Sequence, residues 1–117
     1  VLADGIEPLA GHLRALVEQD VRLCLCTGGT GLGPRDLTPE ALHSLGGRSV
    51  PGLAAMVRTL SAQHTPMAWL SRAEVGQLRG MLILALPGSP RAAAQCLDIL
   101  APVLGHALAM MEGGSHA

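Results

Sequence analysis

The sequence predicts an α/β fold with three layers, doubly wound, in which a mostly parallel sheet lies between helices on both faces. Two short apolar segments, residues 21–26 and 81–86, are typical of strands buried on both sides. Segments with helical spacing of apolar residues precede, separate and follow them. The resulting order of helix, strand, helices, strand and helix is typical of α/β domains.

The first two predicted helices have clear boundaries. Residues 5–19 carry apolar side chains at spacings of three and four, and Asp4 precedes them as the expected N-cap. Thr38 is the expected N-cap of a second, short helix, because Pro39 fits its first turn. This helix is expected to end near the glycines at 46–47.

The second half of the chain contains two further predicted helices and a weaker strand. Pro51 opens the third helix, and residues 67–71 are assigned to an edge strand. Ser89 is the predicted N-cap of the last helix, with Pro90 in its first turn. Pro102 is expected to kink or split that helix, because proline lacks the N–H that a helix interior needs.

Length and composition favour one globular domain. The chain has 117 residues, of which 49% are hydrophobic, so it has enough apolar side chains to build a core. We predict a domain over residues 1–112 and a flexible tail over residues 113–117.

Several classes of function are disfavoured by composition. Trp69 is the only aromatic residue, and the net charge is −1, so neither a nucleic acid nor an acidic lipid surface is an expected partner. No apolar run appears long enough to cross a membrane, and no signal peptide is evident. An odd number of cysteines, Cys24, Cys26 and Cys96, indicates packed thiols in a reducing compartment. We therefore expect a cytoplasmic protein.

A glycine-rich loop follows the first predicted strand, over residues 27–36. Its bare N–H groups suit an anion, phosphate above all. Asp36 and Glu40 follow closely, and their carboxylates could hold a magnesium ion, while Arg35 could neutralise phosphate charge. The alternative is a glycine-rich turn with solvated charges. The loop lacks the ending of a Walker motif and the spacing of a dinucleotide fingerprint.

Further candidate residues lie outside that loop. Pro87, Gly88 and Ser89 follow the second strand, where Ser89 could bind a ligand or only cap the helix. Arg72, next to Ser71, could bind an anion or be a solvated arginine. The histidines show no spacing typical of a metal site.

These motifs together resemble a known family, the molybdopterin adenylyltransferases. The resemblance rests on three adjoining strings: Thr27-Gly28-Gly29-Thr30-Gly31, Pro34-Arg35-Asp36 and Thr38-Pro39-Glu40. It continues through Pro51-Gly52, Leu70-Ser71-Arg72, Gly76, Arg79-Gly80 and Leu86-Pro87-Gly88-Ser89. The family includes bacterial molybdenum-cofactor proteins of the Mog and MoaB type and the N-terminal domain of gephyrin.

The resemblance implies a reaction, a set of site residues and an assembly. The expected reaction transfers the adenylyl group of ATP, with Mg²⁺, to molybdopterin and releases pyrophosphate. Asp36 would be catalytic and would hold the metal with the support of Glu40. The phosphates and the pterin would be bound by Thr27, Gly28, Gly29, Thr30, Gly31, Ser71, Arg72, Pro87, Gly88 and Ser89. The family is typically homotrimeric, and a molybdenum insertase is a possible partner.

The chain departs from the family pattern at its start. The opening strand, its Ser-Asp loop and the helix that follows, a unit of roughly 30 residues, have no counterpart in this sequence. The chain is therefore expected to be either a fragment or a degenerate member. The alternative functions are a molybdopterin-binding module without catalysis and a structural trimerisation domain.

Overall fold

The computed structural model describes residues 5–113 of the chain. The elements follow in the order α1 (Ile6–Glu18), β1 (Leu23–Thr27), α2 (Thr38–Ser44), β2 (Arg48–Ser49), α3 (Pro51–Ser61), the 3-10 helix η1 (Pro66–Leu70), β3 (Glu74–Leu78), β4 (Met81–Leu86) and α4 (Pro90–Met111). Asp4, the expected cap of the first helix, lies outside the described residues, and Gly5 occupies the N-cap position of α1. Most of the predicted tail lies outside them too.

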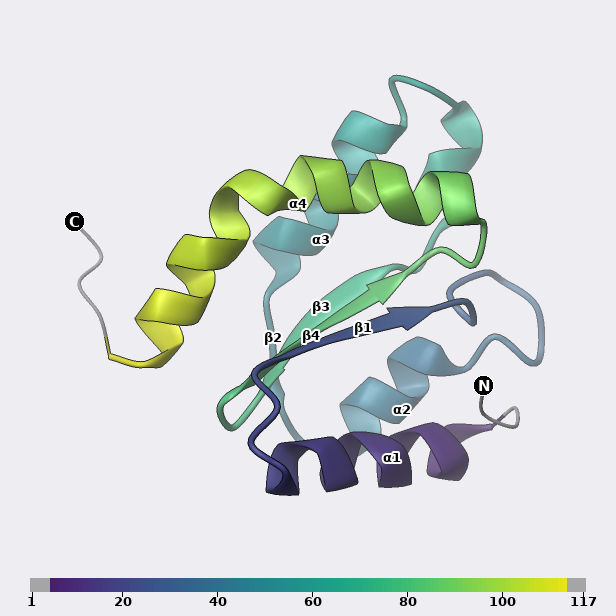
Figure 1. Ribbon diagram of the computed structural model, residues 1–117. Helices are drawn as coiled ribbons and strands as arrows, with labels where there is room; N and C mark the ends of the chain where they lie inside the picture. The colour runs from purple at the N-terminus through teal and green to yellow at the C-terminus, as the bar shows by residue number, and fades with distance from the viewer. Residues whose placement is uncertain (1–4, 114–117) are drawn as a thin grey trace.

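The predicted three-layer α/β fold is confirmed. Helices α3 and α4 cover one face of the sheet, and α1 and α2 cover the other (Figure 1). Strand β4 is buried along its whole length and supplies both cores. Leu82 and Leu84 pack toward α3 and α4, whereas Met81 and Ile83 pack toward α1 and α2. This alternation explains the continuous apolar run in the sequence, because both faces of the strand are covered by helices.

The sheet itself is mixed rather than mostly parallel. Its strand order is β1-β4-β3-β2, and within the described residues only the β1–β4 pairing is parallel. The connection between β3 and β4 is the two-residue turn Arg79–Gly80, which joins neighbouring strands only in the antiparallel sense. Strands β2 and β3 were not predicted from the sequence, and neither was this hairpin.

Two local predictions are corrected by the structure. Residues 67–71 do not form an edge strand: Pro66–Leu70 is a 3-10 helix, opened by Thr65, whose hydroxyl accepts from the N–H of Met67 at 3.3 Å. Thr38 is the first residue of α2 and not its N-cap, which is Leu37. The Thr38 hydroxyl instead donates to the carbonyl of Gly28, so its hydrogen bond serves the preceding loop.

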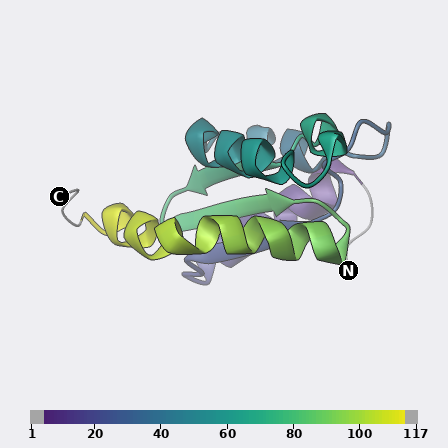
Figure 2. The ribbon, with the colours of Figure 1, turned by 90° about the horizontal axis from the view of Figure 1, so that it is seen from above.

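Helix α4 is a single helix that contains Pro102, so the proline does not split it. The helix changes direction near its middle, and its C-terminal part extends beyond the strands (Figures 1 and 2). By length and composition alone α4 could cross a membrane, with a mean hydropathy of 1.4, which contradicts the expectation that no segment could. Ala93, Cys96 and Leu100 are the residues of α4 that are buried against the sheet, and most of the other residues of the helix are partly or fully exposed.

Candidate functional site

The carboxyl ends of β1 and β4 bring the two predicted ligand loops together. Because these strands are parallel neighbours, their following loops leave the sheet at the same edge. The N–H of Gly28 donates to the carbonyl of Leu86 at 3.0 Å. A Cβ atom on Gly88 would lie 3.2 Å from the Cα of Gly28, so the two backbones pack directly against each other.

Thr38 fixes the start of the glycine-rich loop. Its hydroxyl donates to the carbonyl of Gly28 at 2.9 Å, and its N–H donates to the carbonyl of Gly29 at 3.1 Å. Gly29 has a φ of +71°, and a Cβ there would meet the Thr38 hydroxyl oxygen at 2.2 Å. Glycine is therefore required at position 29 by both backbone conformation and space.

A cavity of about 610 Å³ opens beside this loop, between β1 and α1. Its volume lies in the range of small-molecule sites, about 300–1,000 Å³. Thr27, Gly28 and Gly29 line it on one side, and Leu9 and His12 of α1 line it on the other. The exposed side chain of Arg35 also lines the cavity and places a positive charge beside it. These features fit a phosphorylated ligand.

Asp36 folds the far end of the loop back on itself. Its Oδ2 accepts from the N–H of Gly33 at 2.9 Å, and its own N–H donates to the carbonyl of Gly33 at 3.1 Å. A Cβ on Gly31 would lie 2.8 Å from the same Oδ2, so Gly31 gives the carboxylate its space. The carboxylate thus shapes the loop in addition to any role toward a ligand.

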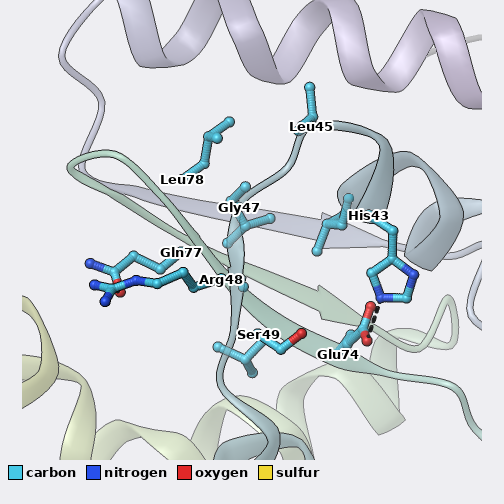
Figure 3. Close-up of a pocket in the computed structure, with 12 residues that line it drawn as sticks. His43, Leu45, Gly47, Arg48, Ser49, Glu74, Gln77 and Leu78 are labelled. Atoms are coloured by element: carbon cyan, nitrogen blue, oxygen red, sulfur yellow. Dashed lines mark hydrogen bonds and ion pairs between the residues drawn. The ribbon is translucent and has the colours of Figure 1, made fainter.

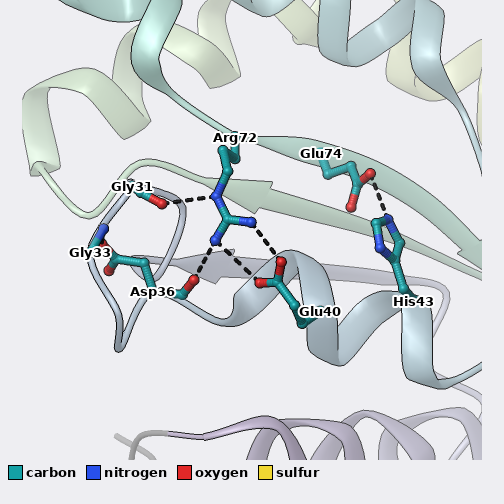
Figure 4. Close-up of polar contacts among 7 residues, drawn as sticks. All are labelled: Gly31, Gly33, Asp36, Glu40, His43, Arg72 and Glu74. Atoms are coloured by element: carbon teal, nitrogen blue, oxygen red, sulfur yellow. Dashed lines mark hydrogen bonds and ion pairs between the residues drawn. The ribbon is translucent and has the colours of Figure 1, made fainter.

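Arg72 crosses from the strand side of the site into the same loop (Figure 4). Its Nε donates to the carbonyl of Gly31 at 2.9 Å, and its Nη2 donates to the carbonyl of Asp36. Its Nη1 and Nη2 donate to the two carboxylate oxygens of Glu40 at 2.6 and 3.2 Å. The hydrogen bond from Arg72 holds the pKa of Glu40 below its usual value, and Glu40 raises the pKa of Arg72.

Asp36 and Glu40, the predicted magnesium pair, both contact protein groups in this geometry. Both oxygens of Glu40 accept from Arg72, and one oxygen of Asp36 accepts from the loop. No group of three or more His, Cys, Asp or Glu side chains suited to a metal occurs in residues 5–113. Asp36 and Glu40 are thus close in the fold but are bound to protein groups.

The other predicted site residues differ in their exposure to solvent. Gly88 and Ser89 are exposed, and Ser89 caps α4, accepting from the N–H of Ala92 at 3.4 Å. Ser71 accepts from the N–H of Ala73 at 3.1 Å, which stabilises its own turn. Thr30 is a buried residue, only 4% exposed.

A second, smaller pocket between α2 and β3 is too small for a substrate (Figure 3). Its volume is about 20 Å³, enough for a single water. His43 Nε2 and Glu74 Oε1 meet at its rim, 2.8 Å apart. This contact joins α2 to β3 across 31 residues, a separation at which no local sequence pattern predicts a contact.

The three cysteines behave largely as packed thiols. Cys96 lies on α4 and is buried against the sheet, and Cys24 and Cys26 are half-buried on one face of β1 toward α1 and α2. A hydrogen bond from Cys26 lowers the pKa of the Cys24 thiol to about 7, and the same contact raises the pKa of Cys26. No disulfide joins these described cysteines.

Comparison with known proteins places this geometry in a family. Residues 1–106 match the family described as "Probable molybdopterin binding domain". The chain is 44% identical over 115 residues to a molybdenum cofactor biosynthesis bifunctional protein of Synechococcus elongatus, covering 98% of this chain and 36% of that protein. It is 44% identical over 88 residues to a molybdopterin adenylyltransferase of Haemophilus influenzae, covering 74% of this chain and 44% of that one.

Solved structures agree in fold. The molybdopterin biosynthesis Mog protein of Mycobacterium ulcerans superposes with a TM-score of 0.91 at 40% identity, covering 97% of this chain and 73% of that chain. The chain thus spans about a third of the length of its first curated relative and nearly three quarters of this solved neighbour. With the two loops, the cavity and the sequence match in agreement, the chain belongs to the molybdopterin-binding domain family of molybdenum cofactor biosynthesis proteins, as its motifs indicate.

Proposed function

We propose that this domain takes part in molybdenum cofactor biosynthesis by adenylylating molybdopterin. A phosphate oxygen of molybdopterin would attack the α-phosphorus of ATP, the bond to the β-phosphate would break, and pyrophosphate would leave. Transfers of this kind depend mainly on positioning and on charge neutralisation. Magnesium enters here as the counter-ion of ATP, so no metal bound to Glu40 is needed.

The observation that carries the proposal is the contact between the two loops. Gly28 and Gly88 touch at the carboxyl ends of parallel strands, where α/β proteins bind ligands. Backbone N–H groups of the glycine-rich loop would bind phosphate on one side, and Gly88 and Ser89 at the N-terminus of α4 would bind on the other. The names of the relatives, molybdopterin adenylyltransferase among them, support the same substrate.

Asp36 is the residue we assign to the transfer step. It is the carboxylate at the far end of the glycine-rich loop, and its Oδ2 already faces the Gly33 N–H. In this position it would orient the transferring group against the bound pterin phosphate.

A non-catalytic binding module is the second candidate. The observation that favours it is the engagement of both Glu40 oxygens by Arg72, which leaves Asp36 as the single acidic group offered to a nucleotide from this loop and helix. Such a module would bind molybdopterin without releasing pyrophosphate from ATP.

Pyrophosphate release by the full-length protein separates the two candidates. Wild-type protein should release pyrophosphate from ATP when molybdopterin is present, and Asp36→Asn should lose most of this release while still binding molybdopterin. Asp98→Asn, an exposed position on α4, is the matched control and should keep full turnover. Near-wild-type turnover by Asp36→Asn would remove Asp36 from catalysis, and binding without any release by wild type would favour the module.

The assembly and the setting are part of the same proposal. We propose a homotrimer in the cytoplasm that passes its product to a molybdenum insertase. Sedimentation equilibrium of the full-length protein tests the first point, since a monomeric or dimeric mass would contradict it.

A further inference from the structure

The middle of the glycine-rich loop is hydrogen-bonded to one residue from elsewhere in the described chain, Arg72. In the described part of the chain, residues 30–36 receive hydrogen bonds from outside the loop only from Arg72. Its backbone N–H donates to the carbonyl of Thr30 at 2.7 Å, and its guanidinium reaches the carbonyls of Gly31 and Asp36. The remaining hydrogen bonds of this segment, between Gly33 and Asp36, lie within the loop.

The guanidinium is itself held in place by Glu40. Arg72 and Glu40 form a two-point contact, in which two N–H groups meet the two carboxylate oxygens. A planar guanidinium in such a contact has its orientation fixed, which a lysine ammonium cannot reproduce. The two side chains are only partly exposed, at 33% and 38%.

A second side-chain contact, between His43 and Glu74, lies beside the contact between Arg72 and Glu40. Glu40 and His43 lie one turn apart on α2, and Arg72 and Glu74 lie two residues apart across from them (Figure 4). Arg72 contacts Glu40, and Glu74 contacts His43, so two side-chain contacts join α2 to residues 72–74. This pairing fixes α2 against the strand that follows Arg72, and so fixes where the guanidinium enters the loop.

We infer that Arg72 is a positioning residue that holds the glycine-rich loop in the shape that binds phosphate, with Glu40 as its partner and not as a metal ligand. The inference rests on the proposed function only for the identity of the ligand. The loop carbonyls of Gly31 and Asp36 are turned toward Arg72. The N–H groups at positions 29–31 donate to no protein atom within residues 5–113, so they remain for an anion. A loop freed from Arg72 would have to be ordered by the ligand, and affinity would fall accordingly.

Hydrogen exchange of the loop amides tests this in the full-length protein without any ligand. Arg72→Lys keeps the charge but cannot make the four contacts, so exchange over residues 28–37 should rise about tenfold. Glu40→Gln should produce a smaller rise. Arg79→Lys is the matched control, because Arg79 pairs with Glu18 at 2.9 Å at the opposite end of β4, and it should leave the loop unchanged. Unchanged loop exchange in Arg72→Lys would overturn the inference.

Calorimetry with Mg-ATP separates positioning from direct contact. We expect Arg72→Lys to bind Mg-ATP about tenfold more weakly and to show a faster-exchanging loop in the same preparation. Weaker binding with unchanged exchange would identify Arg72 as a ligand contact and contradict the inference, as would a loosened loop with unchanged affinity.

A rescue experiment adds a third measurement. Arg72→Ala with added methylguanidinium should regain part of the loop protection, because the guanidinium can rejoin Glu40 and the carbonyls. Methylammonium should not restore it, and equal restoration by both would contradict a geometric role. If wild type binds neither Mg-ATP nor molybdopterin, the proposed function fails, whereas the exchange and rescue measurements still decide the role of Arg72.

Discussion

Gly29→Ala should be strongly destabilising, and its cost is worked out from two separate effects. Gly29 has a φ of +71°, a conformation that costs an alanine about 1–2 kcal/mol. The new Cβ would also meet the Thr38 hydroxyl oxygen at 2.2 Å and its Cβ at 3.2 Å, which adds an overpacking cost of about 1–3 kcal/mol. We therefore expect a total loss of about 3.5 kcal/mol.

Gly46→Ala is the matched control for the backbone effect alone. Gly46 has a φ of +72°, and nothing lies within 4 Å of a Cβ built there. This variant should lose about 1–2 kcal/mol, so the difference between the two variants, about 2 kcal/mol, measures the clash with Thr38.

Urea unfolding followed by circular dichroism measures both variants on the same scale. In a Thr38→Ala background the hydroxyl is absent, and the cost of Gly29→Ala should fall toward that of Gly46→Ala. Equal costs for Gly29→Ala and Gly46→Ala in the wild-type background would refute the idea that Thr38 occupies this space.

Three further predictions concern the last helix and the Glu40 contact. Ser89→Ala should lose about 1 kcal/mol of stability, because the hydroxyl caps α4; if it also binds ligand, molybdopterin affinity should fall, and unchanged affinity would leave only the capping role. Leu100→Ala should cost about 2–5 kcal/mol in urea unfolding, because the Leu100 side chain of α4 is fully buried against the sheet. Since Arg72 lowers the pKa of Glu40 in the folded state, the unfolded state binds more protons, and this contribution to stability is lost as the pH falls below about 4.5, the ordinary pKa of glutamate. Glu40→Gln should accordingly show a shallower loss of stability in acid, and an unchanged acid profile would contradict the role of this contact.

The sequence was sufficient to predict the parts of the fold whose causes are local. Residues 81–86 form a strand buried on both faces, as their continuous apolar run indicates, and Ser89 caps α4 as expected. The meeting of the two loops also follows from the sequence, since parallel strands end at the same edge of a sheet.

Other features depend on partners that are distant in the sequence. Strand β3 contains Gly76 and has only a weak alternation, so its pairing with β4 is visible only once the hairpin closes. Residues 66–70 are apolar enough to resemble a strand, but Thr65 and Pro66 start a 3-10 turn there. Arg72 meets Gly31 and Glu40 across 41 and 32 residues, a separation at which no local pattern exists.

The motif that identifies the family is largely bonded to itself, and this changes how its residues are assigned. Thr38 occupies the space beside Gly29, Asp36 accepts from Gly33, and Glu40 accepts from Arg72. The residues that match the motif in this region therefore fix the shape of the loop. The motif match alone does not identify which of them contact a ligand. Groups that bind the ligand should be sought first at the exposed positions around the cavity and the second loop, namely the side chains of Arg35 and Ser89 and the backbone of Gly88. If this reasoning holds, Arg72→Lys will loosen the loop as it weakens binding, whereas Arg35→Ala will weaken binding and leave the loop unchanged.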